Sequence, residues 1–264
     1  MNSSIDVALR SRLSAVKMAS LAKASHIGSS LSIIDILAVL YTDILSITEN
    51  AETSDSIIIS KGHASAGTYS VLAHSGHIPL ELLESYGQDG STLGGHVTHS
   101  GNPRIELSTG SLGHGIPYGL GIALAQKKNG SNFRTFVVVS DGECDEGTTW
   151  ESALMANHFQ LSNLTIIIDR NRIQSLSGTE NTIALEPLAE KWSAFKWKVI
   201  NVNGHSHSEL KEAMNEKNGP VCIIAETIKG KGVSFMENEV LWHYRPPNED
   251  ELLAAIKEIK KNNL

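Results

Sequence analysis

Two polar residues, Asp141 and Asn171, are the first indication of chemistry in this sequence. Each follows an apolar run, Phe136–Val139 in the first case and Leu164–Ile168 in the second. The stretch between the runs, about 149–160, has a helical pattern, so a strand, a helix and a parallel neighbouring strand are predicted. Both strands then end at one edge of the sheet, where open α/β sheets bind ligands. Asp141 and Asn171 are therefore expected to converge on one ion.

The expected ion is a hard cation. An Asp carboxylate, an Asn amide oxygen and a backbone carbonyl suit Mg²⁺ or Ca²⁺ better than zinc. Mg²⁺ held by so few protein groups usually shares its coordination shell with phosphates. In the competing interpretation, Asp141-Gly142 only forms a turn and Asn171 only caps a chain end. On these residues alone, both interpretations remain open.

A glycine-rich stretch, residues 108–125, precedes this unit and has glycines at 110, 113, 115, 119 and 121. Its first part is predicted to be a loop and its second part a helix. Backbone N–H groups at a helix N-terminus form an anion site, and glycines 115, 119 and 121 are expected to allow close packing. All five glycines could serve packing alone. The position of the loop directly before the strand–helix–strand unit favours a diphosphate cradle.

Three further loops combine His with Gly between predicted elements. They contain His26, His63 and His96, and the glycine and serines around His26 are expected to keep the backbone there accessible. Their spacing fits no familiar zinc signature. His205 and His207 are expected to lie outside any site.

The alternation of strands and helices predicts an α/β fold, with a mostly parallel central sheet and helices on both faces. No repeat or linker divides the chain, so 1–264 is expected to be a single domain. The other predicted elements are helices at 4–24, 31–45 (capped by Ser29 or Ser30), 78–88 and 208–217, an irregular stretch at 174–190, strands at Ser56–Ser60, Lys196–Val202 and Val221–Thr227, and a surface helix at 249–260.

Composition excludes several classes of protein. The formal net charge is −7 without a basic patch, so no nucleic-acid partner is expected. The N-terminus lacks the apolar core of a signal peptide, and no apolar run reaches about 18 residues. We therefore expect a cytoplasmic protein with no membrane contact. Cys144 and Cys222 are too far apart for a metal motif.

The segment from Ser140-Asp141-Gly142 to Asn171 resembles the thiamine diphosphate fingerprint, in which G-D-G is followed by Asn within about thirty residues. Ser140 replaces the first Gly. Residues 10–247 resemble the N-terminal, diphosphate-binding domain of transketolase. The matching segments are Ser25-His26-Ile27-Gly28 (S-G-H-P-G in the family), Ser60-Lys61-Gly62-His63-Ala64, Gly95-His96, Thr109-Gly110-Ser111-Leu112-Gly113-His114-Gly115 (T-G-P-L-G-Q-G) and, more loosely, Trp242-His243-Tyr244-Arg245-Pro246-Pro247.

The resemblance implies the thiamine diphosphate-binding fold of the diphosphate type and a role for each matching residue. His26 and His243 would contact the substrate and relay protons, and His96 would bind the terminal hydroxyl of the donor. Asp141, Asn171 and the Ile173 carbonyl would hold Mg²⁺ or Ca²⁺. The residues implied to contact thiamine diphosphate are His63, Gly110, Ser111, Leu112, Asp141, Gly142, Glu143, Asn171, Ile173 and His243. Glu146 matches a carboxylate at the subunit interface of the family.

The implied activity is transfer of a two-carbon glycolaldehyde unit from a ketose, as the phosphate or an analogue, to an aldose. Full-length transketolases are more than twice as long, and their second domain binds the aminopyrimidine and activates the cofactor. The chain therefore resembles the N-terminal subunit of a split transketolase. A C-terminal, pyrimidine-binding subunit would be a separate chain in an α2β2 heterotetramer.

Three alternatives remain open. The fingerprint is shared by the E1 α-type subunit of 2-oxo acid dehydrogenases and by deoxyxylulose-phosphate synthase, although the set of His26, His63 and His96 favours transketolase. A regulatory cofactor-binding subunit without activity is the alternative outside the enzymes. Neither the donor ketose nor the acceptor aldose can be identified from the sequence.

Overall fold

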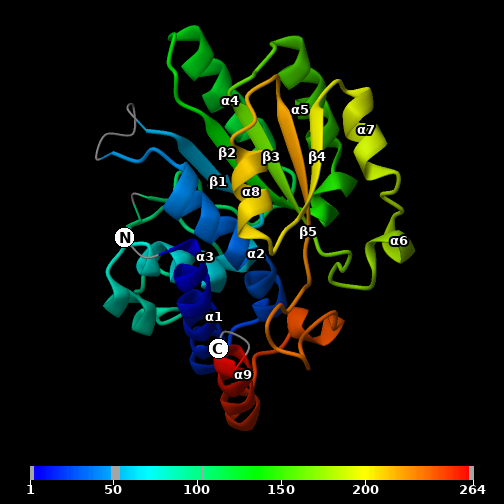
Figure 1. The fold of residues 1–264 in the computed structure, drawn as a ribbon. Helices are drawn as coiled ribbons and strands as arrows, with labels where there is room; N and C mark the ends of the chain where they lie inside the picture. Colours follow the sequence, from blue (N-terminus) through cyan, green and yellow to red (C-terminus); the bar gives the residue numbers. More distant parts are fainter. Residues whose placement is uncertain (1–2, 49–53, 103, 262–264) are drawn as a thin grey trace.

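A parallel five-stranded sheet forms the centre of the protein in a computed structural model, which describes residues 3–48, 54–102 and 104–261 (Figure 1). The strands lie in the order β1-β2-β3-β5-β4, and every neighbouring pair is parallel. Their bounds are Ser56–Ile59 (β1), Thr135–Ser140 (β2), Leu164–Arg170 (β3), Lys198–Asn203 (β4) and Val221–Glu226 (β5). The predicted fold class is confirmed.

Successive strand residues face opposite sides of the sheet, and each side has its own hydrophobic cluster. Ile57 and Phe136 belong to one cluster, while Ile58 and Val137 belong to the other. This alternation follows from the two-residue period of a strand. The three strands β1, β2 and β3 are buried on both faces, which explains why they read as continuous apolar runs.

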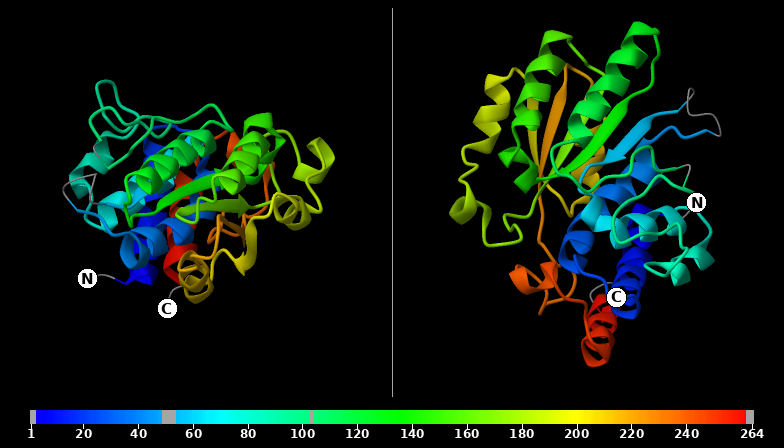
Figure 2. Two further views of the ribbon diagram at one scale, coloured as in Figure 1. Left: turned by 90° about the horizontal axis from the view of Figure 1, so that it is seen from above. Right: turned by 180° about the vertical axis from the view of Figure 1, so that it is seen from behind.

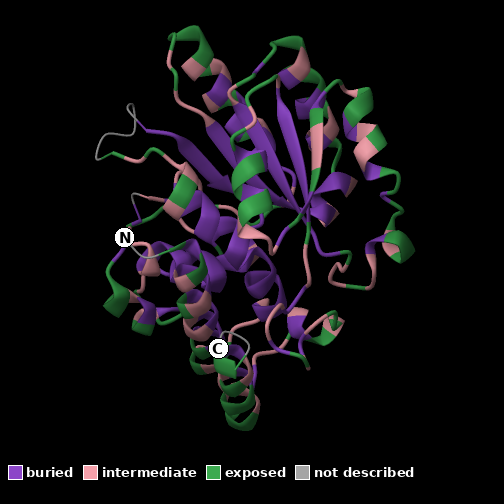
Figure 3. Ribbon diagram, viewed as in Figure 1, coloured by how far each residue is buried: buried purple, intermediate pink, exposed green. Residues whose placement is uncertain are grey.

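Helices cover both faces of the sheet (Figure 2). The first cluster includes residues of α1 (Ser4–Leu21), α2 (Ile27–Val39), α3 (Ser65–His74) and α8 (His207–Met214). The second cluster includes residues of α4 (Gly115–Lys128), α5 (Gly147–His158) and α7 (Leu188–Ala194). In Figure 3 the strands β1, β2, β3 and β5 and helix α2 are largely buried, while exposed residues gather on the outer helices and on the edge strand β4.

Helix α2 lies at the centre of the first cluster, and all its residues are buried. With the following π-helical turn Leu40–Ile44, it is long and apolar enough to cross a membrane, with a mean hydropathy of 1.6. Within this span 83% is buried inside the protein, so packing in the core accounts for its composition.

The start of α2 differs from the expectation that Ser29 or Ser30 caps a helix at 31–45. The helix begins at Ile27, after His26 in the left-handed conformation with φ 69°. Both serines are buried in the first turn. A Cβ on Gly67 would lie 2.5 Å from the Ser30 carbonyl oxygen, so this turn serves the close approach of α3 instead of capping.

Other boundaries were also predicted wrongly. The stretch 174–190, expected to be irregular, holds α6 (Thr179–Thr182) and the start of α7. The helix expected at 78–88 is a 3₁₀ helix, Leu80–Ser85, and further 3₁₀ turns span Gly62–Ala64, Asp141–Asp145 and Val240–His243. By contrast, helix α9 (Glu249–Lys261) is the amphipathic surface helix expected at 249–260, and it packs Ala255 and Ile259 towards α1.

The glycines of α4 differ in what they contribute. A Cβ on Gly119 would lie 2.4 Å from Val137 Cγ2 and 3.4 Å from Ile58 Cδ1. This glycine therefore lets α4 lie directly on β1 and β2. A Cβ on Gly115 would meet Ser60, whereas one on Gly121 would meet nothing within 4 Å. The expectation of close packing is wrong for Gly121, which faces solvent.

We predict opposite effects of alanine at these two positions. Gly121→Ala should raise the free energy of unfolding by about 0.5–1 kcal/mol, because alanine favours the helix. Gly119→Ala gains the same propensity but overpacks the contact with β2, so it should be about 1–3 kcal/mol less stable than Gly121→Ala. Urea unfolding measures both variants. Equal stability of the two would show that α4 does not rest on the sheet at Gly119.

Candidate functional site

A cavity of about 240 Å³, here called the edge cavity, lies at the carboxyl ends of β2 and β3. Ser140 of β2 pairs with Asp169 of β3, so the residues that follow these two strands meet at this edge. The sequence-predicted site residues that line the edge cavity are His26, His63, His96, Gly110, Leu112, Asp141, Gly142, Asn171, Ile173 and His243.

Asp141 supplies the carboxylate of the edge cavity and is only 2% exposed. Its Oδ2 accepts hydrogen bonds from the Arg172 backbone N–H (2.7 Å) and from Arg170 Nη1 (3.2 Å), and its Oδ1 accepts one from the Gly142 N–H (2.9 Å). Burial and the nearby charge of Asp169 raise the pKa of Asp141, although the bond from Arg172 and the charge of Arg170 oppose the rise. A divalent cation would stabilise the ionised carboxylate.

Two further oxygens accompany this carboxylate. Asn171 Oδ1 accepts a hydrogen bond from the Ile173 N–H (3.1 Å), and the Ile173 carbonyl accepts one from Lys229 Nζ (2.9 Å). Arg172, between these residues, has φ 66°, and this left-handed turn places them on one loop. A carbonyl oxygen has two lone pairs, so one remains for a cation beside the bond from Lys229.

These residues fit a hard cation that is shared with a diphosphate. Over the described ranges, no three His, Cys, Asp or Glu side chains gather as a metal cluster, so a metal here would need ligands from a bound phosphate. Gly110 and Gly142 line the edge cavity without a side chain of their own, and each lies in ordinary contact distance of a neighbouring side chain. A Cβ on Gly110 would lie 3.4 Å from the His96 ring, and a Cβ on Gly142 would lie 3.4 Å from the Gln174 side chain.

Three imidazole rings surround that of His26 in the edge cavity. The His26 ring centroid lies 5.4 Å from that of His63, 5.6 Å from that of His96 and 4.6 Å from that of His243. The His26 backbone N–H also donates to the His243 carbonyl (3.0 Å), which joins the start of α2 to the 3₁₀ turn at Val240–His243. Residues from four separated segments are thus brought to one place.

Three of these four rings are held neutral. Burial, followed by the charges of His96, Lys229 and Lys61, lowers the pKa of His26 to about 4. Burial and the charge of Lys229 lower the pKa of His243 to about 3. Burial also lowers the pKa of His63 well below its ordinary value. A neutral imidazole carries one donor and one acceptor nitrogen, so it can hold or accept a proton.

Lys229 lines the edge cavity and was not among the residues predicted from the sequence. It is 1% exposed, and its Nζ contacts both the Ile173 carbonyl and His243 Nδ1 (3.2 Å). Burial and the charge of Lys61 lower its pKa to about 8. Its position in the sequence could have indicated this, because Lys229-Gly230 closely follows β5. The carboxyl end of β5 lies at the same edge of the sheet as that of β3. Ser29, Gln174 and Ser175 also line the edge cavity and were not identified.

Two residues predicted to bind the cofactor do not line the edge cavity. Ser111 is exposed on the glycine-rich loop. Glu143 is fully buried and accepts hydrogen bonds from the backbone N–H groups of Gly113 (3.0 Å) and Ser140 (2.8 Å) and from the Ser60 hydroxyl. Glu143 therefore ties the glycine-rich loop to the ends of β1 and β2. Glu146 is exposed beside them.

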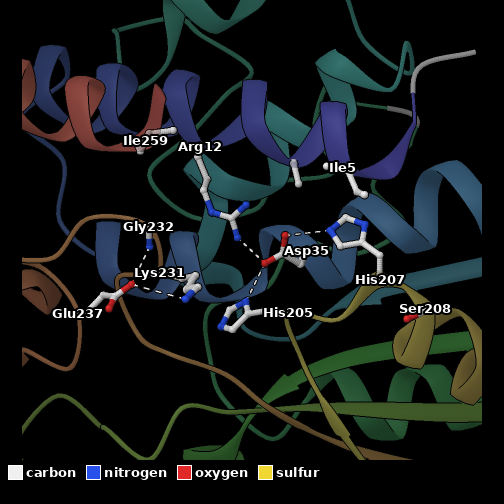
Figure 4. Close-up of a pocket in the computed structure, with 11 residues that line it drawn as sticks. Ile5, Arg12, Asp35, His205, His207, Ser208, Lys231, Gly232, Glu237 and Ile259 are labelled. Carbon is white, nitrogen blue, oxygen red and sulfur yellow. Dashed lines mark hydrogen bonds and ion pairs between the residues drawn. The ribbon is translucent and has the colours of Figure 1, made fainter. Parts of the chain in front are cut away.

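A second cavity of about 780 Å³, the Asp35 cavity, holds His205 and His207 (Figure 4). Asp35 on α2 accepts hydrogen bonds from Arg12, from His205 Nδ1 (2.7 Å) and from His207 Nε2 (3.1 Å). Burial raises the pKa of Asp35, but the charge of Arg12 and these hydrogen bonds outweigh it and hold the pKa well below its usual value.

Charged groups in the Asp35 cavity are already paired. Arg12 bonds to Asp35, and Lys231 lies 3.8 Å from Glu237. The sequence placed His205 and His207 outside the site, and neither residue lines the edge cavity. The Asp35 cluster joins α1, α2 and the start of α8, so it serves the fold.

Comparison with known proteins gives consistent matches. The family model for the transketolase, thiamine diphosphate binding domain matches residues 4–262. The chain is 38% identical to an apulose-4-phosphate transketolase subunit of Phocaeicola vulgatus over 249 residues, or 91% of this chain and 88% of that protein. It is 35% identical to the 6-deoxy-6-sulfo-D-fructose transketolase subunit SqwG of Clostridium sp. over 243 residues, or 89% and 88% of the two chains.

A solved structure extends the match to three dimensions. Transketolase from Leishmania mexicana superposes with a TM-score of 0.90 at 27% identity, over 98% of this chain. The chain spans 42% of the length of that protein. With the domain model and the relatives of similar length, this likeness shows that the chain belongs to the family of transketolase thiamine diphosphate-binding domains.

Proposed function

We propose that this chain is the N-terminal subunit of a two-chain transketolase that moves a two-carbon ketol unit from a ketose to an aldose. The observation that carries the proposal is the edge cavity. It brings the oxygens of Asp141, Asn171 and Ile173 together with the glycine-rich loop and the imidazole cluster around His26. The match to relatives of similar length that are named transketolase subunits supports the same activity.

Thiamine diphosphate, when bound, supplies a nucleophilic carbon and an electron sink for cleavage next to a carbonyl. In our proposal Asp141, Asn171 and the Ile173 carbonyl hold Mg²⁺ or Ca²⁺, and the metal shares its shell with the diphosphate. The diphosphate is proposed to lie against the backbone of Gly110 and Gly142, which both line the edge cavity.

The imidazoles are proposed to serve the sugar. The neutral ring of His26 can donate one hydrogen bond to a hydroxyl and accept a proton from another, whereas His243, whose Nδ1 accepts from Lys229, can only donate to a hydroxyl. His96 is proposed to bind the terminal hydroxyl of the donor. Lys229 Nζ donates to His243 Nδ1, which leaves the Nε2 nitrogen of that ring as the hydrogen donor.

The remaining half of the site is proposed to come from a pyrimidine-binding partner subunit in an α2β2 assembly. The relatives of similar length are named subunits, whereas the Leishmania transketolase is more than twice as long. The donor is proposed to be a ketose phosphate or a related ketose. Relatives named for apulose-4-phosphate and for 6-deoxy-6-sulfo-D-fructose make branched and sulfonated sugars the first candidates to assay.

Asp141→Ala tests the metal site. Residues that only contact a metal ligand typically contribute about 10–100-fold to metal affinity. Asp141 is proposed as a direct ligand, so its loss should weaken Mg²⁺-dependent binding of thiamine diphosphate by more than this. Glu180→Ala is the matched control, because Glu180 is also an Arg170 partner but is largely exposed. Calorimetric titration of the cofactor at several Mg²⁺ concentrations measures both. Unchanged Mg²⁺ dependence in Asp141→Ala would refute the metal assignment.

Protonation of the imidazole cluster gives a prediction for pH. The folded pKa values of His26 and His243, about 4 and about 3, lie below the unfolded value of 6.5. Both rings therefore contribute stability above about pH 6.5, and this stability is lost as the pH falls from there toward the folded values. Between about pH 7 and about pH 5, the free energy of unfolding should therefore fall more for wild type than for His243→Gln, which urea unfolding at each pH measures.

NMR titration of the His243 and His26 rings gives a direct check of the same prediction. Both should remain neutral well below the ordinary histidine pKa of about 6.5. Titration of either ring near that ordinary value would show that the cluster is open to water and that its environment does not hold it neutral.

Activity should require both chains. Binding of the diphosphate fixes only one end of the cofactor, and the reactive ring would lose the benefit of orientation, up to about 7–11 kcal/mol in favourable cases. The assay measures ketol transfer with thiamine diphosphate and Mg²⁺, first for this chain by itself and then together with its partner. Equal turnover by the lone chain would overturn the two-chain proposal.

A further inference from the structure

Asp169 lies directly behind the proposed metal site and is completely buried. Its Oδ2 accepts hydrogen bonds from the Asn171 amide Nδ2 (2.9 Å) and the Ser32 hydroxyl (2.7 Å). The same oxygen accepts from Lys61 Nζ, and the other oxygen, Oδ1, accepts from the Thr227 hydroxyl. Asp169 belongs neither to the fingerprint residues nor to the matching family segments.

The contact between Asp169 and Asn171 decides which way the amide faces. A carboxylate only accepts hydrogen bonds, so Asn171 must direct its NH₂ group toward Asp169. The amide oxygen then points the other way, where it accepts from the Ile173 N–H and is available at the edge cavity. A cation needs this oxygen, because a flipped amide would present hydrogen-bond donors to it.

The charge of Asp169 is balanced inside the protein. Lys61 and Asp169 form an ion pair in which both side chains are 0% exposed. An unpaired charge in such a place would be strongly destabilising. Lys61 follows β1, Ser32 belongs to α2 and Thr227 follows β5, so three separate segments hold the carboxylate in one orientation.

We propose that Asp169, with Lys61 as its charge partner, is a positioning residue that fixes the Asn171 amide with its oxygen toward the metal. This inference rests on the proposed function of the edge cavity. It assigns Asp169 a role in metal affinity, beyond a contribution to the stability of the fold.

Asp169→Asn tests the proposal, because an amide at 169 can donate as well as accept and no longer selects one orientation of Asn171. At saturating thiamine diphosphate, the Mg²⁺ dissociation constant of the two-chain complex should rise about 10–100-fold, as for other outer-shell partners of metal ligands. Asp35→Asn is the control. It changes another buried carboxylate that is paired with a cation, but in the Asp35 cavity, and it should leave Mg²⁺ affinity unchanged.

The double variant Asp169→Asn with Asn171→Asp separates positioning from stability. It keeps the total charge of the pair, and a carboxylate at 171 offers oxygen on either side, so orientation no longer has to be selected. Mg²⁺ affinity should return to within a few-fold of wild type. If Asp169→Asn fails to fold, this double variant is measured alone against wild type, and a folded double variant with weak Mg²⁺ binding would overturn the proposal.

Two failures remain distinguishable in these titrations. If wild type shows no Mg²⁺-dependent binding of thiamine diphosphate, the proposed function fails. If wild type binds and Asp169→Asn binds Mg²⁺ with the same affinity, the metal site stands and only the positioning role of Asp169 is wrong.

Discussion

The parallel pairing of β2 with β3 is the constraint on which the site depends. Their register places Ser140 opposite Asp169, so the chain leaves both strands at the same level of the same edge. Asp141 and the loop of Asn171 and Ile173 then face one cavity. A shift of one residue would turn every side chain of a strand to the other face and separate these groups. The hydrophobic clusters on the two faces oppose that shift, because each depends on the same alternation.

Buried charge around this edge is arranged in compensating pairs. Lys61 balances Asp169, and Arg170 balances Asp141 while also bonding to Glu180 and Glu186. Lys229 lies on the remaining side with its amine on the Ile173 carbonyl. Ion pairs in such places cost desolvation energy and are weak evidence for stability. We infer that these ion pairs instead fix the orientation of the polar side chains at the edge cavity, where a cation and an anionic cofactor would bind.

The apolar runs and the glycines of the chain made much of this predictable. Phe136–Val139 and Leu164–Ile168 identified the two central strands, and the polar residues after them marked the edge where the site lies. His26, His63, His96 and His243 were expected together from a family resemblance, and the structure places them around one cavity. The spacing of the residues alone gave no reason for His243 to join the other three.

Residues whose roles come from burial could not be predicted in the same way. Lys61 and Lys229 look like surface lysines in the sequence, and only tertiary packing removes them from water. Glu143 was expected at the cofactor. Its buried carboxylate instead accepts hydrogen bonds from the backbone N–H groups of Gly113 and Ser140 and from the Ser60 hydroxyl. The start of α2 was misplaced because serines that resemble caps instead pack against α3 at Gly67.

In the proposed function, Asp141, Asn171 and the Ile173 carbonyl form one metal site that receives a diphosphate. Anomalous diffraction from crystals of the two-chain complex with Mn²⁺ and thiamine diphosphate tests it most directly. We expect a single Mn²⁺ peak in the edge cavity, bonded to these three oxygens and to the diphosphate. A Mn²⁺ peak elsewhere, or a diphosphate bound without contact to Asp141 and Asn171, would contradict it.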